Sequence, residues 1–348
     1  MTSNYAAWDI NENDFPIAGS GSDKVRFMLG YGVLAPNTHN TQPWKFEALS
    51  DNKVKITPDW SKVLPFSDPS NRGMFISLGC CVLNIMTAAD HFGWAVEYSV
   101  EGEAPLSSYV LLMFHLRDEA VRSEPNLGKL LPFITGRQSH KMPFQEGAIP
   151  DQAIQALSLI TFNDARVVVT TDSRSKDLIA HLHLASTMKF SKNRGFRREV
   201  SRWMRASSTE RFDGMPGSTF GLSNVPSLLA KYVTKIVPSS VKIVAKKDFV
   251  ILRDAPALGV VVTHAEGPLS WVSAGMVYQQ AGLTMAAEEI LLAPKAATIE
   301  VGCGRELAMI FGATGIPQLY FGLGYGDGIQ RHSPRRSSDH VLIGHSDT

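Results

Sequence analysis

Three side chains in one short segment have the chemistry to bind an anion. Arg137, Ser139 and Lys141 stand at alternate positions, and alternate side chains of an extended segment point to the same side. Arginine can bind a phosphate through two parallel hydrogen bonds, lysine supplies a point charge, and a serine hydroxyl adds a donor. A second pair of cations, Arg335 and Arg336, lies near the end of the sequence. Taken alone, each cluster is more simply explained as a solvated loop.

The segment from residue 35 to residue 46, APNTHNTQPWKF, is dense in polar groups between two apolar segments. Its two prolines each fix a backbone angle, and Asn37, Thr38, Asn40 and Gln42 offer amide and hydroxyl groups to a ligand. Asn and Thr beside Pro are also common turn residues. Local chemistry leaves two interpretations open, a rigid loop that faces a ligand and a plain turn.

Other kinds of catalytic site lack support in the sequence. It contains no HExxH, CxxC, GxSxG or GxxxxGK[ST] motif, which disfavours zinc hydrolysis, dithiol chemistry, a hydrolase nucleophile elbow and a P-loop. His39 and His140 lie in the two polar loops without a Cys or carboxylate at ligand spacing, so we predict no metal site. No side chain is assigned as a catalytic acid, base or nucleophile.

The composition is that of a protein with a large core and balanced charge. The chain has 348 residues, of which 44% are apolar, and 34 Lys and Arg against 33 Asp and Glu. A net charge of +1 predicts neither a nucleic-acid nor a membrane partner. The three cysteines, Cys80, Cys81 and Cys303, form no disulfide framework, and the polar start carries no secretion signal. We expect a cytoplasmic protein.

The order of predicted elements is mixed α and β. Helical patterns cover residues 23–34, 68–93, 150–160, 173–188, 270–290 and 304–311, and strand patterns cover residues 45–49, 53–57, 94–100, 109–116, 165–170, 258–263 and 318–323. The two most apolar helices resemble each other. Gly79 is followed five positions later by Asn84, and Gly275 is followed five positions later by Gln280. This echo is either chance or the trace of an internal repeat.

Residues 189–247 differ from the rest of the chain. Seven Lys and Arg occur between residues 189 and 205 with one Glu among them, which fits either an anion-binding surface or a solvated helix face, and we favour the second. Residues 227–247 are amphipathic and basic. They fit a membrane-surface segment or a lid packed on the body, and we favour the lid.

Together, the polar segments resemble motifs of the nitroreductase superfamily of FMN proteins, particularly its fused single-chain members related to the mycobacterial Acg proteins. Residues 35–44, APNTHNTQPW, are similar to the family's A-P-S-x-x-N-x-Q-P-W loop. Residues 137–144, RQSHKMPF, are similar to its R-x-S-x-R/K-x-F loop with one extra residue before the Phe. Gly324-Tyr325-Gly326 and Pro334-Arg335-Arg336 are similar to its closing G-Y-P and P-R-R segments.

This resemblance implies an α+β fold of two fused, pseudo-symmetric halves, each with a mainly antiparallel sheet packed by helices. The expected division is an N-terminal arm at 1–22, a first half at 23–132 and a second half at 133–342, with a lid-like insertion at about 189–247. FMN would lie between the halves. The resemblance implies that Arg137, Ser139, Lys141, Arg335 and Arg336 hold it from the second half, and that Asn37, Thr38, Asn40 and Gln42 hold it from the first.

The resemblance also implies an activity. We expect an FMN-dependent oxidoreductase that passes hydride from NAD(P)H through the flavin N5 to a small electron-poor substrate. The alternative is a flavin-binding or sequestering protein with little reductase activity, in which the insertion fills the substrate space. The segment before residue 23 carries no second R-x-S-x-R/K-x-F loop. We therefore expect one FMN per chain, and a monomer with an internal pseudo-dimer that can dimerise further.

Overall fold

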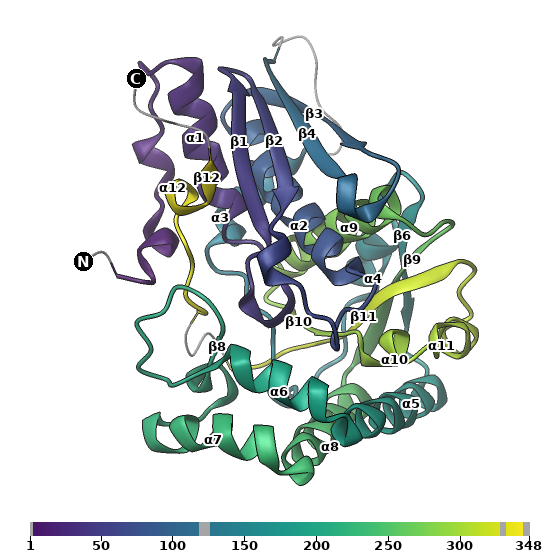
Figure 1. The fold of residues 1–348 in the computed structure, drawn as a ribbon. Helices are drawn as coiled ribbons and strands as arrows, with labels where there is room; N and C mark the ends of the chain where they lie inside the picture. Colours follow the sequence, from purple (N-terminus) through teal and green to yellow (C-terminus); the bar gives the residue numbers. More distant parts are fainter. Residues whose placement is uncertain (1–2, 118–125, 328–331, 344–348) are drawn as a thin grey trace.

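The chain forms two five-stranded sheets with helices between and around them (Figure 1). The computed structural model describes residues 3–117, 126–327 and 332–343. The first sheet consists of β1 (Trp44–Ser50), β2 (Lys53–Pro58), β3 (Trp94–Glu101), β4 (Tyr109–Leu116) and β12 (Leu342–Ile343). The second consists of β5 (Thr161–Phe162), β6 (Ala165–Thr170), β9 (Ala257–Thr263), β10 (Leu291–Lys295) and β11 (Ile316–Gly324).

Twelve α-helices occur in the described residues, and the six that begin at residues 21, 72, 151, 173, 268 and 304 lie close to the predicted positions. They are α1 (Gly21–Gly32), α2 (Arg72–His91), α3 (Leu131–Ile134), α4 (Asp151–Ser158), α5 (Ser173–Lys192), α6 (Arg194–Trp203), α7 (Asn224–Ile236), α8 (Pro238–Asp254), α9 (Pro268–Ala286), α10 (Ala297–Glu300), α11 (Gly304–Phe311) and α12 (Ser338–Val341). The first begins two residues earlier than predicted, because Ser20 and Asp23 form a reciprocal capping box. Helix α2 begins at Arg72, and the Asp68 carboxylate caps it by accepting from the backbone of Gly73 and Met74.

The two sheets repeat one topology. The first has the strand order β12-β1-β2-β4-β3, and the second has the order β10-β11-β9-β6-β5. Apart from the edge strands β12 and β5, the order β1-β2-β4-β3 corresponds to β6-β9-β11-β10, and every pairing within these two sets is antiparallel. A long apolar helix follows the second strand of each set, α2 after β2 and α9 after β9. The predicted α+β class with two pseudo-symmetric sheets is confirmed.

Helices α2 and α9 cross at two glycines. A Cβ atom on Gly79 would lie 1.9 Å from the carbonyl oxygen of Val272, and one on Gly275 would lie 2.0 Å from that of Ile76. Each glycine thus makes room for a carbonyl of the other helix, and that carbonyl lies three residues before the other glycine. Such a reciprocal contact is expected of two helices related by a two-fold axis. The paired glycines of the sequence echo therefore lie together at the centre of the molecule, where only glycine permits this approach.

Helix α2 is the central helix of the core. Among the described residues it is the one helix that is long and apolar enough to cross a membrane by length and composition, and most of it is buried inside the protein. Its one amide, Asn84, donates to the carbonyl of Tyr31 and accepts from the side chain of Gln279. Gln279, and not the Gln280 of the sequence echo, is the partner of Asn84.

The extra elements lie between β6 and β9, where the first sheet has only the tight turn between β1 and β2. They comprise α5, α6, α7 and α8, together with β7 (Met204–Arg205), β8 (Met215–Pro216) and a 3-10 turn at Gly217–Phe220. Figure 1 shows α6, α7 and α8 along the lower edge of the molecule. We call residues 193–237 the cap. The residue boundaries of the two halves and of the lid-like insertion remain predictions.

The N-terminal segment is packed against the body, whereas the sequence pattern predicted an arm. Residues 1 and 2 lie outside the described part. Trp8 stacks on His332 with ring centroids 3.9 Å apart, and Phe15 stacks on Phe92 with centroids 4.0 Å apart. The Asn4 amide donates to two carbonyls of the cap, those of Thr209 and Arg211. The few apolar residues of this polar segment therefore suffice to anchor it.

Candidate functional site

The segment that carries Arg137, Ser139 and Lys141 runs along the edge strand β10. The His140 amide donates to the carbonyl of Leu292 over 2.8 Å, and Ser139 pairs with the same residue in a parallel bridge. The segment thus pairs with β10 at Ser139 and His140, while the Arg137 amide donates to the Phe133 carbonyl at the end of α3.

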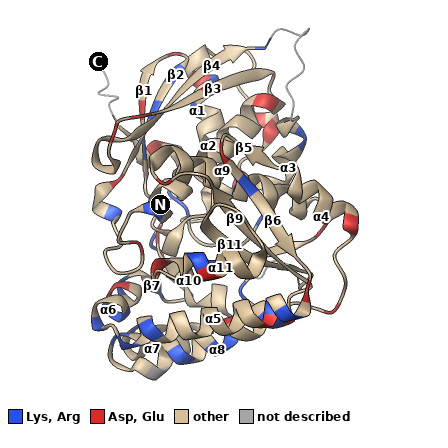
Figure 2. Cartoon of the chain, turned by 90° about the vertical axis from the view of Figure 1, so that its right-hand side faces the viewer, with Lys and Arg blue, Asp and Glu red and all other residues tan. Residues whose placement is uncertain are grey.

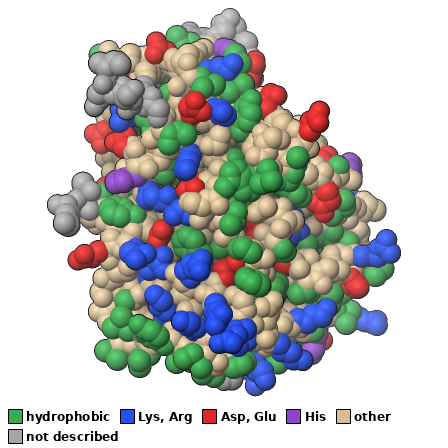
Figure 3. All heavy atoms as spheres, viewed as in Figure 1, with side chains coloured by type: hydrophobic (Ala, Val, Ile, Leu, Met, Phe, Trp, Pro, Cys, Tyr) green, Lys and Arg blue, Asp and Glu red, His purple; other side chains and the backbone are tan. Residues whose placement is uncertain are grey.

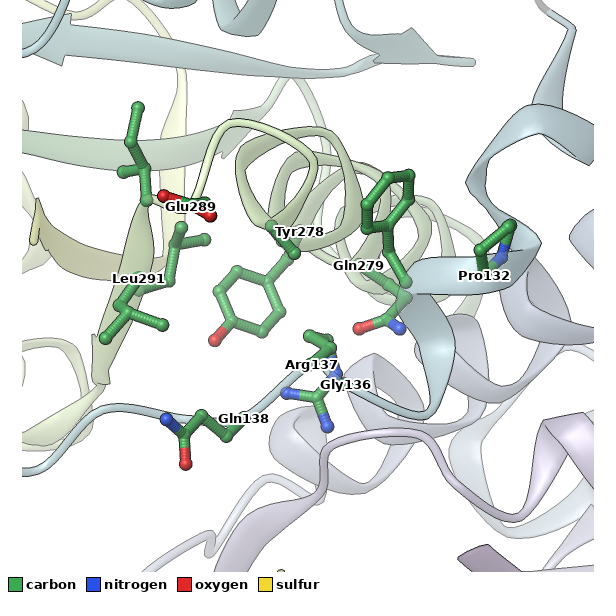
Figure 4. A pocket seen from close by; sticks show the side chains of 13 residues that line it. Pro132, Gly136, Arg137, Gln138, Tyr278, Gln279, Glu289 and Leu291 are labelled. Carbon is green, nitrogen blue, oxygen red and sulfur yellow. The ribbon is translucent and has the colours of Figure 1, made fainter. Parts of the chain in front are cut away.

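Arg137 is a buried cation beside a pocket. Its side chain is 7% exposed and its Nε has no hydrogen-bond partner. Burial lowers the pKa of Arg137, since charge is costly away from water. The pocket has a volume of about 150 Å³ and includes Tyr278 and Gln279 of α9 in its lining. In Figure 4, Arg137 and Gln138 reach into it from the loop, opposite Tyr278.

Tyr278 is a site residue that the sequence analysis did not identify. Burial raises the pKa of its phenol well above the usual value, while Arg137 and the Ser139 side chain act in the opposite direction. Its hydroxyl therefore stays protonated and can act as a hydrogen-bond donor in the pocket. A tyrosine within an apolar helix pattern carries no sequence mark of such a role.

Lys141 lies under the cap. Its ammonium group donates to the Thr219 hydroxyl over 3.2 Å and lies 4.2 Å from the centroid of the Phe220 ring. Burial lowers the pKa of Lys141 to about 8, and the positive charges of Lys295 and Arg335 act in the same direction. The effect of these neighbours shows that several cations share one region.

Arg335 brings a third cation to this region. Burial lowers its pKa to about 9, and Arg137 lowers it further. Its guanidinium donates to the Asn40 side-chain oxygen and to the Ala35 carbonyl, and it lies 5.0 Å from the Trp8 ring centroid. These contacts hold Arg335 against the loop at 35–42 and against Trp8.

Arg336 binds the loop at residues 41 and 42. Its backbone amide donates to the Gln42 side-chain oxygen over 2.8 Å, and its guanidinium donates to the Thr41 carbonyl over 2.6 Å. Burial lowers the pKa of Arg336, while Asp213 and Asp59 raise it. Arg336 therefore has acidic neighbours, in contrast to Arg137 and Arg335.

The loop at 37–42 is held in an uncommon backbone conformation. His39, Asn40 and Gln42 have φ angles of 53°, 54° and 52°, in the left-handed region that costs energy for residues other than glycine. The Gln42 amide N–H donates to the Asn37 side chain, which stabilises the turn. Thr38 lies against Gly73 of α2. Strained backbone tends to occur at functional sites, which favours the interpretation of a rigid loop over that of a plain turn.

Two of the predicted ligand-facing amides bind protein groups. The Asn40 amide donates to the carbonyls of Gly214 and Pro334, both over 2.9 Å. The Gln42 amide donates to the Phe212 carbonyl over 2.6 Å. These side chains join the loop to the cap and to the segment at 333–337, which we call the C-terminal strap.

Of the two histidines in the polar loops, His39 lies near the cation Lys141, and His140 packs against Phe144 instead. Burial lowers the pKa of His39 to about 4, and Lys141 acts in the same direction. His39 also hydrogen-bonds to the Ser67 hydroxyl over 3.2 Å. His140 stacks on Phe144 with ring centroids 4.8 Å apart. Within the described ranges, His, Cys, Asp and Glu side chains form no group of three that could hold a metal ion.

Arg335 thus lies close enough to Arg137 and to Lys141 for their charges to interact, and Asp248 partly offsets the lowered pKa of Lys141. In the described ranges no carboxylate lies within 4 Å of Arg137, Lys141 or Arg335. The nearby Asp248 is paired with Lys295 at 2.6 Å. Buried charges without partners are costly, so this arrangement is suited to bind an anion with several acceptor oxygens.

Comparisons with known proteins support the resemblance that the motifs indicated. No protein-family model matches the chain. Two Mycobacterium tuberculosis proteins, both named "Putative NAD(P)H nitroreductase", are 30% identical over 77 residues, which is 22% of this chain and 22% of each relative. The match thus spans under a quarter of these relatives. Their names agree with the predicted similarity to the nitroreductase superfamily, which is confirmed at this level.

Several solved structures are similar in arrangement. An FMN- and NADPH-dependent nitroreductase from sphigopyxis sp. strain HMH is 15% identical, with a TM-score of 0.41 over 63% of this chain and 98% of that one. An iodotyrosine deiodinase bound to FMN and 3-iodo-L-tyrosine is also 15% identical, with a TM-score of 0.41 over 63% and 99%. A Mycobacterium smegmatis FMN-dependent nitroreductase in complex with NADPH is 13% identical, with a TM-score of 0.38 over 62% and 97%.

Proposed function

We propose that this protein is an FMN-dependent NAD(P)H oxidoreductase of the nitroreductase type. The observation that carries the proposal is the convergence of Arg137, Lys141 and Arg335, which are covered and lack acidic partners in the described part of the chain. A phosphate group would supply the missing negative charge. The order of the sequence motifs supports FMN as its bearer, and the names of the two relatives support NAD(P)H as the reductant.

The residues of the site fit this cofactor in distinct ways. Arg137, Lys141 and Arg335 would hold the phosphate. Ser139 and Tyr278, with Asn37 and Thr38 of the loop, would supply hydrogen-bonding groups beside the polar parts of the ring system. When bound, FMN supplies hydride transfer from NAD(P)H to a small electron-poor substrate. The chain's own contribution is to bind, orient and exclude water.

We infer an indirect role for Asn40, Gln42 and Arg336, which the sequence predicted to contact the cofactor. In the proposed site they hold neighbouring segments in place. The Asn40 amide binds the cap and the C-terminal strap, and the Gln42 amide binds the cap. The Arg336 guanidinium binds the Thr41 carbonyl in the loop. Asn40 accepts a hydrogen bond from Arg335, so it orients one of the three cations. Its effect on cofactor binding is therefore indirect.

A second candidate function is flavin binding or sequestration with little turnover. The observation that favours it is the packing of the cap on the site, where Thr219 and Phe220 cover Lys141. The carbonyls of Phe212 and Gly214 also occupy the amides of Gln42 and Asn40. A cap in these contacts would restrict the space open to a nicotinamide or a substrate.

Two measurements test these proposals. Purified protein should be yellow and release FMN on denaturation, and colourless protein that does not bind added FMN contradicts both functions. Anaerobic addition of NADH and NADPH to the holoprotein then separates them. Bleaching of the oxidised flavin spectrum by either nucleotide supports the oxidoreductase, and persistence of that spectrum with both supports sequestration.

The number of sites and the form of the chain are part of the proposal. The repeated topology would place two halves against each other within one chain, as an internal pseudo-dimer with a single FMN. Flavin released per mole of protein should therefore approach one, and a cytoplasmic location stays an expectation.

A further inference from the structure

Helix α7 has its apolar face turned toward solvent. Its large apolar side chains recur at the spacing of one helical stripe, and all are exposed: Val225 68%, Leu228 54%, Leu229 59%, Tyr232 63%, Val233 44% and Ile236 70%. The opposite face carries small residues. Ser227 is buried there, and Ala230 and Thr234 are half-buried. An ordinary surface helix buries its apolar stripe, so this orientation is inverted.

The apolar surface continues onto α8. Val237 at the junction is 38% exposed, and Ile243 and Val244 of α8 are 70% and 48% exposed. We call the nine side chains together the apolar face. Figure 3 shows hydrophobic side chains gathered at the lower left of the molecule, where Figure 1 places α7. A continuous surface of this kind marks a site of interaction.

The border of the apolar face is positively charged. Lys231, Lys235, Lys242 and Lys246 are all exposed, and the chain has no Asp or Glu between residues 224 and 247. Figure 2 shows Lys and Arg on α6, α7 and α8 at the same edge of the molecule. The net charge of +1 conceals this local excess, which is why the overall composition predicted no membrane partner.

We propose that α7 and α8 bind the surface of a membrane that contains anionic lipids. A protruding apolar stripe bordered by lysines matches an interfacial helix, which buries its apolar side chains among the acyl chains while its cations meet lipid phosphates. A second copy of this chain is a poorer occupant, because a symmetric contact would bring the lysines of both copies together. The proposal is independent of the flavin site.

The test is co-flotation of the full-length protein with lipid vesicles. We expect the protein to float with phosphatidylcholine vesicles that contain phosphatidylglycerol, and to bind pure phosphatidylcholine much more weakly. Salt should weaken the binding, because it screens the lysines. Failure to float with the anionic vesicles overturns the proposal, and so does equal binding to both kinds of vesicle.

Matched variants locate the contact. Leu229→Glu with Ile236→Glu should abolish flotation, whereas Leu159→Glu, at a site 75% exposed and outside the apolar face, should leave it unchanged. Lys231→Gln and Lys235→Gln should each reduce vesicle partitioning by roughly fivefold. Circular dichroism and thermal melting establish that each variant is folded. Unchanged flotation of the folded double variant overturns the proposal.

Sedimentation equilibrium addresses the competing occupant. The membrane proposal is overturned if the protein does not bind anionic vesicles and instead forms a stable dimer. Dissociation of that dimer in the Leu229→Glu, Ile236→Glu variant would assign the apolar face to a second copy.

Discussion

Arg335 donates a hydrogen bond to the side-chain oxygen of Asn40, 295 positions earlier in the chain. The same amide group of Asn40 donates to carbonyls in the cap and in the C-terminal strap. One buried asparagine thus holds together the first polar loop, the cap and a cation of the candidate site. This position requires a left-handed backbone conformation at Asn40, which costs conformational free energy.

Replacement of Asn40 by Ala should destabilise the protein and weaken FMN retention. It removes three hydrogen bonds and leaves buried groups without partners, each worth about 1–3 kcal/mol. Asn71→Ala is the control, because Asn71 has a similar φ of 61° and no side-chain capping bond. Urea denaturation should show a clear excess loss for the Asn40 variant. Equal losses would mean that backbone strain alone accounts for the effect.

Arg137→Met should separate stability from binding. Removing a buried cation that lacks an acidic partner in the described chain should stabilise the FMN-free protein by about 1–3 kcal/mol. The same change should lower FMN retention more than Arg198→Ala does, since Arg198 is exposed on α6. Denaturation of the FMN-free protein and equilibrium dialysis with FMN measure the two effects. Retention equal to that of Arg198→Ala would remove Arg137 from the site.

The lowered pKa of Lys141 predicts opposite pH trends for affinity and stability. Its folded-state pKa is about 8 and its ordinary value is 10.5. Between these values the unfolded chain binds the proton and the folded chain does not, so the contribution of Lys141 to stability rises with pH. FMN affinity should instead fall above about pH 8, because the phosphate favours the charged amine.

A comparison with Lys141→Met isolates that group. The variant should lose both pH trends relative to the wild type, as followed by thermal melting of the FMN-free protein and by flavin fluorescence titration. Parallel curves for the two proteins from pH 8 to pH 10.5 would show that other groups titrate in this range.

Gly79→Ala should be among the most destabilising single-methyl substitutions in this protein. The added carbon would lie 1.9 Å from the Val272 carbonyl oxygen, so α2 and α9 would have to separate, at a cost above about 3 kcal/mol. Gly304→Ala is a suitable control, because its methyl would lie 3.8 Å from the Ile299 side chain, at ordinary contact distance. Thermal melting compares them. A small shift for Gly79→Ala would mean that the helix crossing is adaptable.

Much of the fold was predictable because its strongest patterns are local. The apolar helices α2 and α9, the strand patterns and the capping carboxylate Asp68 are all visible in short windows. The echo between Gly79 and Gly275 also corresponded to a real symmetric contact. The pairing of Asn84 with Gln279 was not predictable, since it depends on the relative rotation of two helices that are apolar on nearly all sides.

The candidate site was predictable only in part, because a side chain's partner is not a property of its type. Arg137 and Arg335 are both buried, and the positive charge of Arg137 lowers the pKa of Arg335. Asn40 and Gln42 were expected to face a ligand, yet their amides bind carbonyls of the cap, which has no counterpart in the first half. Tyr278 was hidden within an apolar helix pattern. The inverted face of α7 was equally hidden, since periodicity does not show which side of a helix meets solvent.

The distance in sequence between Asn40 and Arg335 also has a consequence for synthesis. At about 5–20 residues per second, a ribosome needs roughly 15–60 s to make the 295 residues that separate them. The cap is made before the end of that interval, but until Arg335 is made the Asn40 loop lacks its cationic partner and the complete C-terminal strap. A nascent chain therefore cannot assemble the anion site, and any cofactor must enter after translation of Arg335.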